Sequence, residues 1–411
     1  MIYDYVIVGG GIAGLYSAYL LLQKNRNTSI LLLERDTYLG GRIKTIRTND
    51  LTFEAGAGRF NQNHKLLLSL LKRLRIDDKM VQINGEIQFQ PSSTYHKSMQ
   101  KYRHQSPFEM MDKVLSKMKR ESKTTLRKHT FITYAETVLE KEQVQFILDS
   151  FGYYEQLVSM NACDAYKLFE EGMHSKNTFY TLIDGMDQII YRLYDQIKLN
   201  IELKLKYELD NLEYKDGCVH VHVKQRTTPF MAKKCICALP QQSIKEIPFF
   251  KTHASKIIDS VGTKTLCRIY SQFKPEDVWF EHIQKSTTNN PNRYIIPINK
   301  EKGLIMISYT DSKYAAYWKK MHRNALPTAL IHNIYDAFGF EIKRPIYTRR
   351  CFWKMGTSFW LKGTDSTKLH KQMIRPNSAA PIYVCGESFS QNQGWIEGAL
   401  ENVTEMMKHV K

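Results

Sequence analysis

The first fifty residues alternate between short apolar runs and glycine-rich or polar breaks. Residues 3–8 form an apolar, β-branched run that ends at three consecutive glycines, Gly9-Gly10-Gly11. Apolar side chains then recur at helical spacing from residue 12 to 22, and a second apolar run covers 30–33. This pattern predicts a strand, a tight turn, a helix and a second strand.

Further apolar runs predict the elements that follow along the chain. Residues 203–212, 219–223 and 235–239 are predicted to be strands, and residues 151–162 lie in a predicted helical stretch. Asp184-Gly185 predicts a turn, and the apolar residues after it predict a helix. Residues 85–150 carry no motif that bears on fold or chemistry.

The glycines near the N-terminus have the spacing of a dinucleotide-binding turn. Gly9 permits the tight turn, Gly11 lets the backbone approach a pyrophosphate, and Gly14 lets the helix pack against the strand. Ala13 lies in the first helical turn, whose free N–H groups favour phosphate. Glu34 follows Gly14 by twenty residues, where a carboxylate binds ribose hydroxyls, and Arg35 is next to it.

Three further segments narrow the choice of dinucleotide. They are Leu39-Gly40-Gly41-Arg42, Glu54-Ala55-Gly56-Ala57-Gly58-Arg59 and the distant C-terminal pair Gly386-Glu387 with Gly394-Trp395-Ile396-Glu397-Gly398-Ala399. With these motifs the chain resembles the flavin-containing amine oxidase superfamily, in a version similar to those of large DNA viruses. The resemblance implies FAD as the cofactor.

The resemblance also assigns roles to single residues. It implies that Gly41, Arg42, Gly58 and Arg59 contact the cofactor, and that Glu387 beside Gly386 hydrogen-bonds the ribityl chain. Leu209 matches a position beside the adenine, although a core leucine is equally compatible. Trp395 and Ile396 begin a helix aimed at the flavin, which favours the reduced anion. Glu397 is expected to be an ordinary helix residue.

The predicted fold class is α/β, with two domains built from interleaved segments. A Rossmann-like FAD-binding domain is predicted from residues 1–78, 176–245 and 379–411. A substrate domain of antiparallel sheet plus helices is predicted from residues 79–175 and 246–378. A chain of 411 residues with 43% hydrophobic side chains is long enough for two cores.

The family resemblance implies an aromatic slot that orients the amine against the flavin. Trp395 matches one of its two aromatics. The second is expected within residues 356–360, where Phe359 and Trp360 are both candidates. This segment contains no cysteine, so the FAD is expected to be non-covalent.

One position departs from the family pattern. The family has a lysine, five residues before an aromatic, that holds a water against flavin N5. Counting back from Phe273 places Arg268 there, and Lys264 is the alternative if the register is shifted. A guanidinium could hold the water or bind a substrate carboxylate. Oxidase, dehydrogenase and inactive protein therefore all remain open.

The charge of +18 affects the choice of partner and substrate. Basic residues crowd residues 117–128, but without interleaved aromatics they are interpreted as a solvated helix face and not as a nucleic-acid site. A cationic protein repels polyamines and favours smaller amines, amino acids or anions.

The cysteine count and the apolar pattern predict where the protein is found. Seven scattered cysteines without a CxxC pair predict reduced thiols. No long apolar stretch, signal peptide or metal-ligand cluster is recognised, so a soluble, cytoplasmic, metal-free protein is expected. A virus-encoded protein, either in the host cytoplasm or packaged in virions, is a further interpretation. A homo-oligomer is left open.

The function that these observations favour is an FAD-dependent amine oxidase acting on a small amine or amino acid, with molecular oxygen as the second substrate. Two alternatives are kept. One is a desaturase or protoporphyrinogen-oxidase-like enzyme, and the other is a non-catalytic, FAD-loaded scaffold.

Overall fold

Parallel strands form the centre of the first sheet. The computed structural model describes residues 1–48, 50–93, 95 and 97–410. Strand β1 (Ile2–Val8) lies between β2 (Ile30–Glu34) and β12 (Phe230–Cys237), parallel to both. The sheet is completed by β9 (Ile201–Leu205), β10 (Leu209–Lys215), β11 (Cys218–Val223) and β18 (Ile382–Val384). All five residues of β2 are buried, as expected for a parallel strand covered on both faces.

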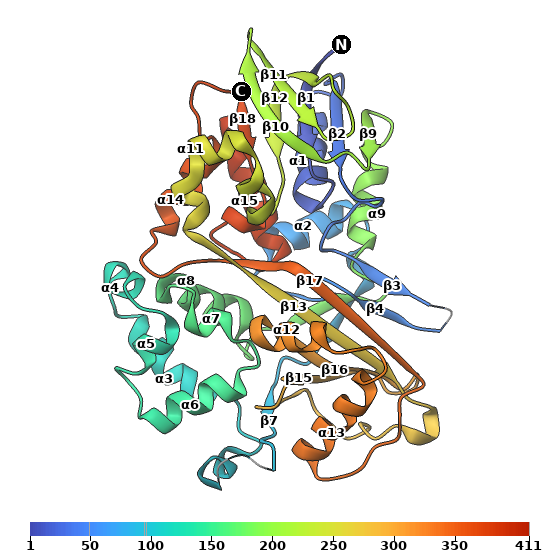
Figure 1. Cartoon of the computed structure of the whole chain (residues 1–411), viewed down its shortest axis with the longest axis vertical. Coiled ribbons are helices and arrows are strands. Elements are labelled where there is room, and N and C mark those ends of the chain that lie inside the picture. Colours follow the sequence, from blue (N-terminus) through green and yellow to red (C-terminus); the bar gives the residue numbers. More distant parts are fainter. Residues whose placement is uncertain (49, 94, 96, 411) are drawn as a thin grey trace.

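Helices cover both faces of this sheet (Figure 1). On one face lie α1 (Ile12–Lys24), α2 (Lys65–Arg73), α9 (Gln188–Asp195) and α15 (Ile396–His409). The other face packs against α10 (Gln241–Glu246) and α11 (Pro248–Asp259), and α14 (Ser366–Ile374) closes the edge near β18. This doubly wound arrangement confirms the predicted Rossmann-like architecture.

The second sheet is largely antiparallel and has its own core. Its strands, in spatial order, are β17 (Tyr347–Trp360), β13 (Val261–Gln272), β16 (Leu304–Asp311), β15 (Tyr294–Asn299), β14 (Ser286–Thr287) and β7 (Gln88–Phe89). Helices α12 (Ser312–Lys320) and α13 (Leu326–Phe338) pack against this sheet. Figure 1 shows β13 and β17 running from beneath the first sheet far into the lower half.

The segment without a motif forms most of a helical lobe beside the second sheet. Its helices are α3 (Phe108–Met118), α4 (Lys123–Arg127), α5 (Phe131–Ala135) and α6 (Lys141–Ser150), followed by α7 (Glu155–Val158) and α8 (Ala162–Lys167). Two small sheets connect the halves. They are β3 (Thr45–Arg47) with β4 (Thr52–Glu54), and β5 (Phe60–Asn61) with β8 (Phe179–Leu182) and β6 (Met80–Ile83).

Two details differ from the sequence-based expectation. The strand predicted over residues 203–212 is two strands, because Lys206 adopts a left-handed backbone with φ of 65° and turns the chain. Helices α11 and α14, which the predicted map assigned to the substrate domain, pack into the cores of the first sheet. We propose that the boundary expected after residue 245 lies instead near residue 260. Within the described residues, no helix is both long and apolar enough to cross a bilayer.

Candidate active site

A large cavity lies between the two sheets. Its volume is about 1840 Å³, well above the roughly 300–1,000 Å³ of a pocket for one drug-sized ligand. One end is lined by the carboxyl ends of β1, β2 and the loop after β12, and the other by β13, β15, β16 and β17. We call these the nucleotide end and the substrate end. The volume suits a dinucleotide together with a second molecule.

The glycine turn at the nucleotide end has two kinds of glycine. A Cβ on Gly9 would lie 2.4 Å from the Ala238 carbonyl oxygen, and one on Gly14 would lie 1.9 Å from the Gly9 oxygen. Glycine is therefore required at both positions, because a side chain there would collide with the protein backbone. A Cβ on Gly11 would meet nothing closer than the Gly40 oxygen at 4.0 Å. The space over Gly11 belongs to the cavity, which Ala13 also lines.

Glu34 is held in place at the end of β2. Its carboxylate accepts hydrogen bonds from the backbone N–H groups of Gly10 at 2.7 Å and Asp36 at 2.8 Å. The side chain is buried yet lines the cavity, as do exposed Arg35 and, further along, Leu209. The structure thus brings the predicted ribose-binding acid and the predicted adenine neighbour into one cavity wall.

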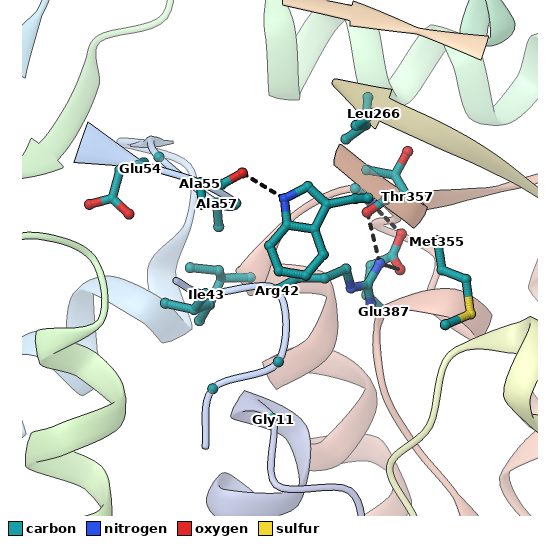
Figure 2. A pocket seen from close by; sticks show the side chains of 18 of the residues that line it. Gly11, Arg42, Ile43, Glu54, Ala55, Ala57, Leu266, Met355, Thr357 and Glu387 are labelled. Carbon is teal, nitrogen blue, oxygen red and sulfur yellow. Dashed lines mark hydrogen bonds and ion pairs between the residues drawn. The ribbon is translucent and has the colours of Figure 1, made fainter. Parts of the chain in front are cut away.

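Arg42 and Glu387 join the two ends of the chain beside the cavity (Figure 2). The Arg42 Nη1 atom lies 2.8 Å from the Glu387 Oε2 atom and also donates to the Gly356 carbonyl oxygen. The other Glu387 oxygen accepts from the N–H groups of Ser358 and Gly394. Glu387 is therefore a fully bonded anchor in this structure.

Helix α15 begins at the cavity, as predicted. Its first residue is Ile396, and Trp395 precedes it as the cap; both line the cavity. Glu397 points away and accepts hydrogen bonds from the N–H groups of Leu66 and Leu67 at 2.8 Å each, which caps α2. Glu397 thus has a structural role in joining two helices.

A bulge in β17 decides which side chains of that strand line the cavity. Lys264 pairs with Thr357, but Leu266 pairs with Trp353, so β17 carries two extra residues. Trp353 and Thr357 line the cavity, and the Trp353 indole donates to the Ala55 oxygen at 2.6 Å (Figure 2). The Thr357 hydroxyl is buried without a partner among the described residues.

The slot prediction for Phe359 and Trp360 does not agree with this geometry. Trp360 is fully buried and its indole donates to the Ser390 oxygen, while Phe359 packs in the core of the helical lobe. Neither side chain lines the cavity. Both residues lie at the end of β17, paired with Gly262 and Val261, beyond the part of the strand that lines the cavity.

Arg268 and Lys264 both line the substrate end but are held differently. The Arg268 Nη1 atom donates to the Glu54 carbonyl oxygen at 2.9 Å, and the guanidinium lies 4.5 Å from the centre of the Tyr309 ring. Lys264 forms a fully buried ion pair with Asp311 at 3.3 Å. Asp311 also accepts from the N–H groups of Tyr154 and Glu155. Of the two, Arg268 is the cation without a carboxylate partner.

Comparison with known proteins decides the family. A sequence profile of the family described as flavin containing amine oxidoreductase matches residues 12–402. The chain belongs to this family. It is 23% identical over 453 residues to an L-amino acid oxidase of Bothrops pictus, covering 97% of this chain and 88% of that protein. It is 20% identical over 479 residues to an uncharacterised protein of Acanthamoeba polyphaga mimivirus, covering 98% and 93%.

The fold agrees with a solved member. A putrescine oxidase redesigned in its cofactor binding superposes with a TM-score of 0.80 at 13% identity, covering 100% of this chain and 99% of that one. The chain is thus an FAD-dependent, amine-oxidase-like oxidoreductase.

The residues of the cavity fit FAD by their own chemistry. The open space over Gly11, the free N–H groups at the start of α1 and the anchored Glu34 suit the pyrophosphate and ribose. The unpartnered Thr357 hydroxyl and the start of α15 suit the polar edge of a flavin. No group of three metal-ligating side chains occurs in the part of the chain that the structure describes.

Arg59, which the sequence predicted to contact the cofactor, lies among aromatics, 4.5 Å from the Phe179 ring centre and 5.9 Å from that of Trp395. Four residues that line the same end were not found from the sequence: Tyr153, Tyr294, Tyr309 and Lys285. These residues come from separate loops and strands, so no local motif connects them.

Proposed function

We propose that this protein is an amino acid oxidase. It would convert a small amino acid to an imino acid, which hydrolyses to a 2-oxo acid and ammonia, while oxygen is reduced to hydrogen peroxide. FAD supplies the chemistry when bound, since the flavin accepts a hydride from the carbon that bears the amine. The observation that carries the proposal is Arg59, a cavity cation that no carboxylate of the described residues pairs with.

Arg59 is placed to hold a substrate carboxylate beside the aromatic wall. Its guanidinium lies next to Trp395, whose position at the start of α15 puts it near the expected flavin. A guanidinium binds a carboxylate with two parallel hydrogen bonds, which fixes orientation as well as position. An amine that lacks a carboxylate would leave this charge without a partner.

The same positive charges favour the reactive form of the substrate. Arg59, Arg268 and Lys285 line one end of the cavity. Neighbouring cations lower the pKa of a bound ammonium group and thus favour the neutral amine. Trp395 and Trp353 line this cavity and would help to exclude water. We propose that the FAD is held without a covalent bond, since no cysteine is among the described cavity-lining residues.

The proposal is tested by anaerobic bleaching of the protein-bound flavin. Amino acids and the amines left by their decarboxylation form matched pairs that differ only in the carboxylate. The amino acid of each pair should bleach the flavin faster, and peroxide should appear when air is admitted. Faster bleaching by the amines would contradict an amino acid substrate, and no bleaching by either would favour a non-catalytic FAD protein.

The variant Arg59→Met adds a residue-level prediction. We expect the Kd for the amino acid to rise by about 100-fold, because a charge-assisted, two-point contact is lost. The matched amine should bind no worse, which makes it the internal control. An equal loss for both compounds would mean that Arg59 does not contact the carboxylate.

A further inference from the structure

Two cations at the substrate end have neither a carboxylate partner nor, unlike Arg268, a short hydrogen bond to a backbone carbonyl oxygen among the described residues. They are Arg59 and Lys285, and among the described residues neither forms a salt bridge. Lys285 directly precedes β14, and its Nζ atom makes one long contact, 3.5 Å from the Gly85 carbonyl oxygen. The same atom lies 5.8 Å from the centre of the Tyr294 ring. A half-buried lysine held this weakly lacks a strong partner.

The surroundings of Lys285 make its charge unfavourable without an added anion. Burial lowers the pKa of Lys285 well below its usual range, and the charge of Arg59 lowers it further. A carboxylate bound at Lys285 would offset both effects on its pKa, because an opposite charge favours the protonated form.

The charges at this end do not balance. Lys264 is neutralised by Asp311, but Arg59, Lys285 and Arg268 have no carboxylate partner among the described residues. The Glu54 carboxylate accepts hydrogen bonds from the Thr45 hydroxyl and the Met186 N–H group and forms no salt bridge with Arg59, Lys285 or Arg268. An amino acid with a neutral side chain brings one carboxylate, which is enough for one of these cations. An amino acid with an anionic side chain brings a second carboxylate for another.

We propose that the substrate is an amino acid with a carboxylate in its side chain, which Lys285 binds while Arg59 holds the α-carboxylate. This assignment rests on the proposed oxidase function and names its substrate class. Arg59 lies against Trp395, whereas Lys285 lies over Tyr294 on the second sheet. Two separated cations suit two carboxylates of one molecule better than a single one.

Isosteric substrates give a direct test. L-glutamate with L-glutamine and L-aspartate with L-asparagine differ in charge and hardly in shape. We expect the acidic member of at least one pair to bleach the flavin at limiting concentration with about 30-fold or greater preference. In Lys285→Met this preference should fall by at least about tenfold. A preference for the neutral members, or one that Lys285→Met leaves unchanged, would overturn the assignment.

A matched control distinguishes direct contact with Lys285 from the general attraction of a cationic protein for anions. Lys302 is an exposed lysine between β15 and β16 that does not line the cavity, and Lys302→Met removes the same unit of charge. It should keep the preference of the parent protein. An equal effect of both variants would show that overall charge, and not the Lys285 site, selects acidic substrates.

A binding measurement without turnover distinguishes the two proposals. Glutarate has two carboxylates and no amine, and butyrate is its monocarboxylate counterpart. Glutarate should raise the Tm of the FAD-loaded protein more than butyrate does, and Lys285→Met should remove the difference. This result without bleaching by any amino acid would uphold the dicarboxylate site and contradict the oxidase. Bleaching by neutral amino acids, without a glutarate effect, would uphold the oxidase and contradict the site.

Discussion

At the nucleotide end of the cavity the carboxylates of Glu34 and Glu387 are hydrogen-bonded on both oxygens. At the substrate end Arg59 and Lys285 have no carboxylate partner among the described residues. The first end consists of backbone N–H groups and one ion pair that hold their geometry without a ligand. The cations of the substrate end stay without a counter-charge until an anionic ligand binds.

This difference is expected for a resident cofactor and a passing substrate. A site that keeps one ligand gains from groups fixed in advance, because little order is lost on binding. A site that must select a substrate gains from unpaired charge, since a molecule of the wrong charge leaves buried groups unsatisfied. The predictions below test the two ends in turn, beginning with the largest expected effect.

The largest effect is expected at Gly11. Gly11→Val should abolish FAD binding, because the valine side chain would occupy the cavity where the pyrophosphate is expected. It would not collide with other protein atoms. Gly11 has an extended backbone, with φ of −77° and ψ of −178°, which valine adopts without strain. The measurement is the flavin absorbance of purified protein, beside circular dichroism to verify the fold.

A graded variant serves as the control for Gly11. Gly11→Ala should keep part of the FAD, since it adds one methyl group to the same space. A folded Gly11→Val protein with a full complement of flavin would mean that the pyrophosphate does not approach this turn.

A smaller effect is expected at Arg268. Arg268→Lys should raise the rate at which oxygen reoxidises the reduced flavin, by about tenfold, because a compact ammonium holds water where the guanidinium instead bonds the Glu54 oxygen. Stopped-flow reoxidation measures it directly. An unchanged rate would remove Arg268 from the oxygen reaction, while Lys264, fixed by Asp311, would become the residue to vary.

The last prediction concerns stability and not the flavin, and it is made for His64, whose ring lies 4.7 Å from that of Trp395. Burial, with a further contribution from Arg59, lowers the pKa of His64 to about 3. Unfolded protein therefore binds a proton below about pH 6.5 that folded protein does not, and stability falls as pH drops from 6.5 toward 3. Between pH 7.5 and 5 this proton binding lowers the free energy of unfolding by about 2 kcal/mol.

The variant His64→Asn isolates that contribution. It should be less stable than the parent at pH 7.5, and the difference should shrink by pH 5, as followed by Tm across the range. Parallel curves for the two proteins would show that His64 is not the titrating group.

The nucleotide end was largely predictable because its information is local. Gly9, Gly11 and Gly14 act through one turn, and Glu34 ends the next strand of the same sheet. The positions of Trp395 at the start of a helix and of Glu387 after a strand are also predicted from neighbouring residues. Spacing suffices where the backbone follows regular geometry.

The substrate end was predicted less well because its residues meet only through non-local pairing. Strand β17 lines the cavity with Trp353 and Thr357, on either side of its two extra residues, whereas the expected Phe359 and Trp360 lie beyond the cavity. Such a bulge has no compelling local signature. The left-handed backbone at Lys206 likewise divides a segment into two strands, although its apolar pattern predicts one.

The chain's local patterns were thus sufficient for the Rossmann-like architecture, the family and the cofactor. Folding was needed to bring Arg59 from the loop before β5 and Lys285 from the edge of the second sheet into one cavity. It also placed Asp311 against Lys264 and left the other two cations unpaired. Charge compensation depends on distance in space, and more than two hundred residues separate Arg59 from Lys285 along the chain.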